Sequence, residues 1–189
     1  MIVTSDSAGE PARFLPLEDL ERALQALPGA PTDHGHVSLV VSRRDGGRRE
    51  TPERVRVTPD GGVPGDAWGR QESPQREGQL AVMEIAVARL IAHGQPLLLF
   101  GDNLFLDLDL SAQNLPPGTR LAVGNAVLEV TPKAHNGCWK FRGRFGDAAL
   151  RFVAGPARRH RNLRGIYMCV VAAGEVGPGD AVTVLARGA

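Results

Sequence analysis

The second half of the chain is divided by tight turns into short segments, and this spacing constrains the fold more than any other feature. A Gly-Asn pair at 124–125 separates two alternating segments as a two-residue hairpin turn. Pro-Gly pairs at 117–118 and 178–179 each precede an alternating segment, in the residue order that a type II turn requires. The strands expected in this half are residues 96–100, 103–108, 119–123, 126–131, 165–172 and 180–185. Two such turns leading into short strands predict a small closed barrel.

Helical spacing of apolar residues predicts two or three helices beside the barrel. We expect helices over residues 16–27, 79–93 and 147–154, the last with Asp147 near its cap. Strands are expected at residues 36–42 and 53–58. The fold class predicted is therefore α+β and β-rich, a small strand barrel with flanking helices.

The remaining segments are predicted to be loops. Residues 1–13 are small and polar and are expected to form a loose tail. The four arginines between residues 43 and 49 are expected in a solvated turn. Residues 59–78 are rich in Gly and Pro, and a loop of that length is usually functional or disordered; Trp68 and Arg70 favour a functional loop. Residues 156–163 form a basic loop.

Composition excludes several classes of protein. The chain has 189 residues, a net charge of +1 and ordinary apolar content, which fits one domain and argues against disorder. It contains no uninterrupted apolar stretch long enough to span a membrane and no secretory signal at its start, so a cytoplasmic location is expected. Two cysteines and five histidines show no zinc-site or CxxC spacing.

Cys138 lies at the start of the most basic segment of the sequence. Residues 131–165 hold nine Lys or Arg and one acid, Asp147. Nearby cations favour the thiolate, which is the form of cysteine that attacks electrophiles and binds metals. The alternative is a small buried hydrophobic residue, which is the prediction for Cys169 within the apolar run at 166–171.

Five motifs in order resemble the MOSC domain family, named after the C-terminal domain of molybdenum-cofactor sulfurases. They occupy residues 65–70, 100–104, 123–131, 137–140 and 163–167, and the resemblance extends from about Val37 to Leu185. It implies a MOSC or PK β-barrel-like fold, here over residues 36–187, with residues 1–35 as a tail and short helix. Three departures from the family pattern are Asp102 for Glu, Ala67 where His is common and Gly137 for Pro.

The resemblance also implies a site. Cys138 matches the family's catalytic cysteine, which carries sulfur as a persulfide or binds molybdenum as a metal ligand. The implied cofactor is the molybdenum cofactor (molybdopterin), and the matching cofactor-binding positions are Gly65, Asp66, Trp68, Arg70, Gly101, Asp102, Asn103, Lys140, Arg144 and Arg164. With Arg158, Arg159 and Arg161, the last three would form a groove for the cofactor's phosphate. Asn103 could pair with the pterin edge, and Trp68 or Trp139 could stack on its ring.

The expected function is that of a stand-alone MOSC-domain protein that binds the cofactor, carries sulfur for it, or reduces N-hydroxylated compounds. Sulfur transfer would need a cysteine desulfurase partner, because the chain leaves no room for a pyridoxal-phosphate domain. Reduction would need an external electron-donor protein, because two cysteines cannot hold an iron–sulfur cluster. No membrane or nucleic-acid partner is expected, and the oligomeric state stays open, with a homodimer among the alternatives.

Two other functions remain open at this point. One is a non-enzymatic small β-barrel module that binds nucleic acid or phosphate. Such barrels bind single strands through basic grooves and stacking aromatic residues, and Trp139, Phe141, Phe145 and Phe152 lie among basic residues here. The low net charge argues against this reading. A Cys–His hydrolase would pair Cys138 with His135.

Overall fold

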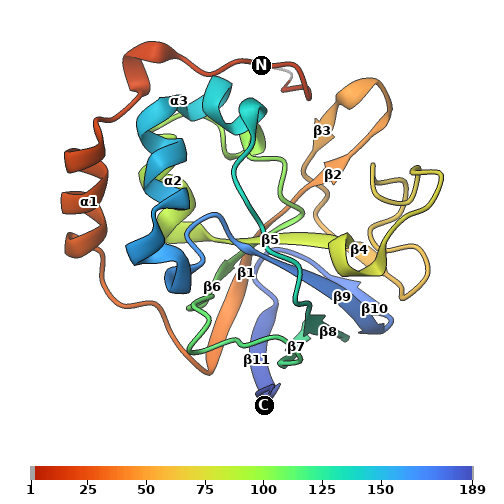
Figure 1. Cartoon of the computed structure of the whole chain (residues 1–189). Coiled ribbons are helices and arrows are strands. Elements are labelled where there is room, and N and C mark those ends of the chain that lie inside the picture. The colour runs from red at the N-terminus through yellow and green to blue at the C-terminus, as the bar shows by residue number, and fades with distance from the viewer. Residues whose placement is uncertain (1–2, 189) are drawn as a thin grey trace.

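The computed structural model describes residues 3–188 and confirms the barrel, with three α-helices grouped beside it (Figure 1). Seven strands close in the order β1, β11, β7, β8, β9, β5, β6. Their bounds are β1 His34–Val40, β5 Leu80–Glu84, β6 Leu104–Asp107, β7 Arg120–Val123, β8 Ala126–Val130, β9 Ile166–Ala172 and β11 Ala181–Ala186. Neighbours pair antiparallel except β5 and β6, which are parallel and joined by a crossover through α2 (Ile85–Ala92).

Two small sheets lie outside the barrel. β2 (Ser42–Arg43) pairs with β3 (Arg49–Glu50), and β4 (Val55–Val57) pairs with β10 (Gly174–Val176). The strand predicted at 53–58 therefore exists without joining the barrel. The strand predicted at 36–42 is divided between β1 and β2.

The turns predicted from the sequence are confirmed. Gly118 and Gly179 have φ of 87° and 88°, as the third residue of a type II turn requires, and Gly124 has φ of 55° in the hairpin between β7 and β8. No helix within residues 3–188 is both long enough and apolar enough to span a bilayer.

The chain builds two apolar cores that share the walls of β5 and β6. In β6, Leu104 and Leu106 point into the barrel core, and Phe105 between them joins the core beneath the helices. A strand buried on both faces has an uninterrupted apolar sequence in place of an alternating one.

This double burial explains why the helix predicted over residues 79–93 is wrong in its first part. Residues 80–84 form strand β5, and the helix α2 begins only at Ile85. Leu80 and Val82 face the barrel core and Met83 faces the helices, so the apolar run satisfies a strand and a helical face equally well.

Two further predictions in this half are corrected. Residues 96–100 are not a strand: Leu97–Leu99 form a 3₁₀ turn after Pro96. The short helix predicted at 147–154 is the second half of α3 (Trp139–Ala154), which breaks at Gly146 with φ of 88°. A side chain there would strike Phe14, because a Cβ would lie 2.8 Å from its ring. The basic segment that follows forms a 3₁₀ helix at Pro156–Arg161.

The prediction of a loose tail over residues 1–13 is wrong for the part that the structure describes. Val3 is buried, and Thr4 forms a bridge with Arg48 beside β3. The amide of Gly9 donates to the carbonyl of Gly143 in α3. The segment then leads through a 3₁₀ turn at Pro11–Arg13 into the predicted helix, α1 (Leu17–Ala26), which packs on α2 and α3. Pairing with the β2–β3 hairpin orders this polar segment.

Candidate functional site

Cys138 lies at the mouth of a cavity of about 310 Å³, at the point where the loop after β8 becomes α3. Its thiol is exposed, whereas Cys169 is buried in β9, as predicted. Cys138 occupies the N-cap position of α3 without a side-chain capping bond, and the positive end of the helix dipole favours negative charge there. The cavity is lined by Ser5, Arg43, Arg49, Ala81, Phe100, Gly101, Asp102, His135, Asn136, Cys138, Lys140, Phe141, Arg144, Arg164 and Tyr167.

One pair of lining arginines is held by buried carboxylates. Asp102 is fully buried, and both of its oxygens accept from Nη1 of Arg164, at 2.9 and 2.8 Å. The next residue, Gly165, packs closely on β5: its φ is 96° and a Cβ would lie 2.1 Å from the carbonyl oxygen of Val82. The Arg164 guanidinium also lies 5.2 Å from the ring centroid of Phe141.

The second carboxylate-held arginine is Arg43. Its Nη2 lies 2.5 Å from Oδ2 of Asp66, and its Nε lies 3.1 Å from each carboxylate oxygen. Burial would raise the pKa of Asp66, but the Arg43 guanidinium and two backbone amides hold it below its usual value. Asp66 therefore remains ionised and fixes Arg43 at the cavity wall.

The other two lining arginines lack a carboxylate partner within residues 3–188. Nη1 of Arg49 donates to the carbonyl of Leu98, and Arg144 donates to the carbonyls of Ser5 and Ser7. Burial and, to a smaller extent, the nearby charge of Arg144 lower the pKa of Arg49 to about 10. Burial also lowers the pKa of Arg144. The fold thus disfavours both charges as it stands.

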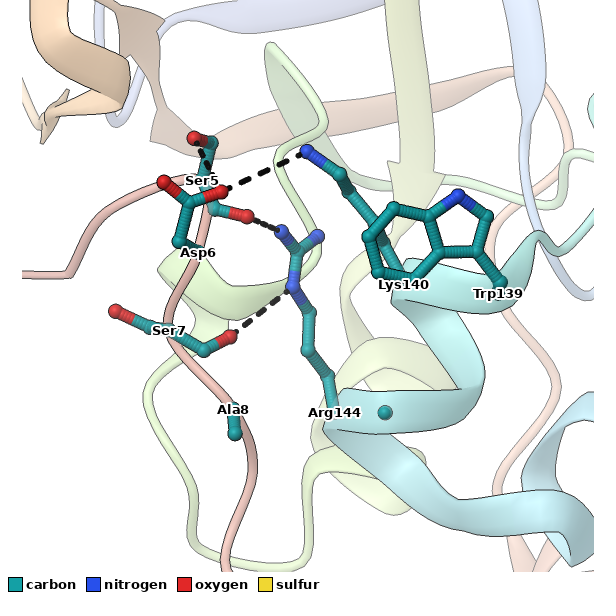
Figure 2. A pocket seen from close by; sticks show the side chains of 8 residues that line it. Ser5, Asp6, Ser7, Ala8, Trp139, Lys140 and Arg144 are labelled. Atoms are coloured by element: carbon teal, nitrogen blue, oxygen red, sulfur yellow. Dashed lines mark hydrogen bonds and ion pairs between the residues drawn. The ribbon is translucent and has the colours of Figure 1, made fainter.

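Figure 2 shows the outer edge of this wall. The side chain of Arg144 points from α3 toward the carbonyls of Ser5 and Ser7. A side cavity of about 180 Å³ lies between residues 5–8 and the start of α3. Nζ of Lys140 lies 3.8 Å from Oδ1 of Asp6, which is too exposed for a strong pair. The indole of Trp139 is 76% exposed, so this residue is not part of the core.

His135 lies on the inner side of the cavity. Its side chain is 6% exposed, its ring centroid lies 4.4 Å from that of Tyr167, and Nδ1 lies 3.6 Å from Oδ1 of Asp102. Burial lowers the pKa of His135 to about 3, and the charge of Arg164 outweighs the opposing effect of Asp102. The imidazole is therefore neutral at pH 7. Nδ1 of His135 and Nε of Arg164 are buried without a hydrogen-bond partner among residues 3–188.

The structure brings together part of the set implied by the sequence. The cavity is lined by Gly101, Asp102, Cys138, Lys140, Arg144 and Arg164. Asn103 lies behind the wall: its amide oxygen accepts from Ala81, and its amide nitrogen donates to Val41 and Asp66.

The loop at 65–70 supports the wall from further away. Trp68 is buried, and its indole nitrogen donates to the carbonyl of Gln75. Arg70 donates to the carbonyl of Gly65 and pairs with Asp45. None of these side chains lines the cavity. The loop is connected to the cavity by Asp66, which holds Arg43 at the cavity wall.

The six basic residues expected in one groove are separated in space. Lys140, Arg144 and Arg164 line the Cys138 cavity. Arg158 pairs with Glu21 of α1, Arg159 lines a neighbouring cavity, and Arg161 lies beside Glu84 and Asp109 elsewhere.

Sequence reasoning missed Arg43 and Arg49, which were assigned to a solvated turn. The two residues are direct cross-strand partners in the β2–β3 hairpin. Like charges directly opposite each other are destabilising, but this pairing is visible only in the folded hairpin, so the sequence carried no signal that marked these two residues.

The structure weighs against both alternative functions. Of the four aromatic residues named for nucleic-acid binding, Phe141, Phe145 and Phe152 are buried and cannot stack on bases, and Trp139 is exposed. Within residues 3–188 no hydrogen bond joins Cys138 to His135, whose nearest charged group is Asp102.

Comparison with known proteins places the chain among related folds. A family model described as the MOSC domain matches residues 84–183, just over half of the chain. A protein described only as hypothetical has a TM-score of 0.59 at 18% identity, covering 82% of this chain and 69% of that one. YuaD from Bacillus subtilis gives 0.58 at 18%, covering 80% and 95%. YiiM from Escherichia coli gives 0.53 at 17%, covering 80% and 71%. No curated protein matches.

Proposed function

This chain belongs to the MOSC domain family, and on that premise we propose that Cys138 holds a molybdenum pterin cofactor or the sulfur destined for one. The observation that carries the proposal is the pair Arg49 and Arg144, two largely buried guanidinium groups that have no carboxylate partner among residues 3–188 and lie in the same cavity as the thiol. A buried charge without a counter-ion destabilises a fold, and an anionic ligand would compensate it.

The residues present fit such a group. A thiolate is the soft ligand that molybdenum or a sulfane sulfur favours. Arg49, Arg144 and Lys140 offer charge-assisted hydrogen bonds to the phosphate of a pterin cofactor. Gly101 has φ of 78° and no side chain, which leaves the wall open beside Arg49. Within residues 3–188 no three His, Cys, Asp or Glu side chains converge as metal ligands, so Cys138 would be the protein's ligand to the metal.

When bound, the cofactor would supply two-electron redox chemistry. The chain's own residues bind and orient it. The carboxylates of Asp102 and Asp66 fix Arg164 and Arg43, so these arginines would keep their positions as the ligand enters. Neutral His135 adds a hydrogen-bonding edge without adding a further positive charge.

As a sulfur carrier, Cys138 would act through its thiolate. The thiolate would attack the outer sulfur of a donor persulfide, a new sulfur–sulfur bond would form at Cys138, and the donor would leave as a thiolate. A cysteine desulfurase could supply that persulfide. Reduction of an N-hydroxylated compound would instead need two electrons from an external donor protein and two protons, with release of water.

The test is analysis of full-length protein from cells supplied with molybdate. We expect molybdenum and pterin, or a persulfide, in the wild type and in Cys169→Ala, and their loss in Cys138→Ala. Cys169 is a matched control because its buried thiol lies outside the cavity. Absence of molybdenum, pterin and persulfide from the wild type would overturn the proposal.

A further inference from the structure

A second cavity, of about 450 Å³, adjoins the Cys138 cavity. The two share His135, Asn136 and Arg164 as a common wall. Its volume lies in the range of small-molecule sites. Arg159 and Arg164 were both expected in the groove for the cofactor's phosphate, but Arg159 lines this second cavity and not the Cys138 cavity.

Of the two arginines that line the second cavity, Arg164 is paired with Asp102 and Arg159 is not paired within residues 3–188. No Asp or Glu of the described residues lines this cavity, and Arg159 is exposed. The two buried nitrogens without partners, Nδ1 of His135 and Nε of Arg164, belong to the shared wall. Neither atom is accessible from the cavity, so the group that an anion there would meet is the guanidinium of Arg159.

Neighbouring arginines on the same 3₁₀ segment differ from Arg159. Arg158 donates to Glu21 at 2.7 Å and to the carbonyl of Phe152 at 3.2 Å. Arg161 lines a cavity that also contains Glu84 and Asp109. Arg159 is therefore the arginine of this segment that remains available to a ligand.

The wall behind Arg159 is preformed. Asn162 adopts a left-handed conformation with φ of 48°, and its side-chain amide donates to the carbonyl of Leu110 at 2.8 Å. Its own carbonyl accepts from Gly165 at 2.7 Å. These bonds fix the turn between Arg159 and Arg164, which reduces the entropy lost when a ligand binds.

We propose that the second cavity is a subsite for the phosphate of a phosphate-monoester substrate, bound by Arg159 and the Arg164 wall, whose other end reaches the Cys138 cavity. His135, Asn136 and Arg164 line both cavities, so the phosphate subsite lies directly beside the Cys138 cavity. That the far end is the reacting end rests on the function proposed above; the phosphate subsite does not.

The experiment is a calorimetric titration of the full chain with adenosine monophosphate, adenosine, orthophosphate and acetate. Charge-assisted hydrogen bonds predict that the monophosphate binds about 10- to 100-fold more tightly than adenosine. We expect orthophosphate to compete with the monophosphate and acetate to compete poorly. Arg159→Gln should remove about 10-fold of the monophosphate affinity, and Arg151→Gln, on the exposed face of α3, should leave it unchanged.

Equal affinity for adenosine and its monophosphate, no binding of the monophosphate at millimolar concentration, or an unchanged Arg159→Gln would each overturn the subsite. Competition by acetate as strong as that by orthophosphate would overturn the choice of phosphate. Molybdenum content separates this result from the proposed function: Arg159→Gln should retain the metal, and Cys138→Ala should lose the metal while keeping its preference for the monophosphate.

Discussion

Four guanidinium groups surround the Cys138 cavity, and they are held in two different ways. Arg43 and Arg164 each lie against a buried carboxylate. Arg49 and Arg144 have backbone carbonyls as their partners within residues 3–188. The first pair can be complete without a ligand, because its charge is neutralised inside the protein. The second pair carries positive charge that the fold does not neutralise.

The difference distinguishes Arg43 and Arg164, which are structural parts of the cavity wall, from Arg49 and Arg144, which are available to bind a ligand. Removing one partner of a buried ion pair leaves an uncompensated charge and destabilises the fold strongly. Removing a buried charge that has no partner relieves an existing cost. Breaking a carboxylate-held pair should therefore lower the stability of the fold. Replacing Arg49 or Arg144 should instead weaken ligand binding without lowering stability.

The largest expected effect is on the carboxylate-held pair. Asp102→Asn leaves the Arg164 charge buried without a counter-ion and should lower the free energy of unfolding by about 3–5 kcal/mol. Urea denaturation measures it. As control, Asp147→Asn breaks an exposed pair with Arg142 and should cost less than about 1 kcal/mol. A loss at Asp102 no larger than the control's would contradict the distinction.

A second effect concerns pH, and it compares His135 in the cavity wall with Glu84 at the start of α2. His135 has a pKa near 3 when folded against 6.5 when free, so its contribution to stability falls as pH drops from 6.5 toward 3. Burial and Asp109 raise the pKa of Glu84 to about 7, so its contribution falls as pH rises from 4.5 toward 7. Between pH 4.5 and 6.5 the two slopes oppose each other.

Glu84→Gln should therefore reveal the His135 slope, with stability rising by up to about 1.4 kcal/mol per pH unit across that window. In His135→Gln only the Glu84 slope remains, so the free energy of unfolding should fall as pH rises over the same range. Denaturation at several pH values measures both. If Glu84→Gln leaves stability level from pH 4.5 to 6.5, His135 is not buried in its neutral form.

A third, smaller effect concerns the pair without carboxylates. Burial lowers the pKa of Arg49 below its free value, so its charged form is disfavoured in the folded state. Arg49→Met should leave the stability unchanged or raise it by about 1 kcal/mol, after allowance for solvent screening and for the lost bond to Leu98. It should also weaken the stabilisation of the wild type by added phosphate. The melting temperature with and without phosphate reports both, and Arg120→Met, from an exposed pair, is the control.

The smallest effect is expected at the outer edge. Trp139→Ala should change stability by no more than about 0.5 kcal/mol, because the indole is exposed. A loss of 3–5 kcal/mol, the usual cost of truncating a core tryptophan, would show that this side chain packs inside the fold.

The sequence predicted the barrel because its turns are local: Gly118, Gly124 and Gly179 lie where a turn requires them. It did not separate β5 from α2, because Leu80, Val82 and Met83 are buried on two faces and carry no strand alternation. Hairpin pairing is what orders the tail beside Arg48, and no local pattern of residues 3–9 encodes it.

The candidate site was predicted in part for the same reason. Cys138 and Lys140 lie in one basic segment, and the family motifs indicated Asp102 and Arg164. Arg49 reaches the cavity only because β3 folds back beside the loop at residues 98–101, a contact between distant parts of the chain. Charge and spacing in the sequence cannot distinguish that arginine from those of an exposed turn.

The central claim is that Cys138, Arg49 and Arg144 form a binding site for an anionic molybdenum pterin or its sulfur. The most direct test is intact-mass and peptide analysis of the non-reduced protein from molybdate-supplied cells. The account predicts a sulfur or cofactor adduct on the peptide that contains Cys138, and none on the peptide that contains Cys169. An unmodified Cys138, in protein that also lacks molybdenum and pterin, would contradict it.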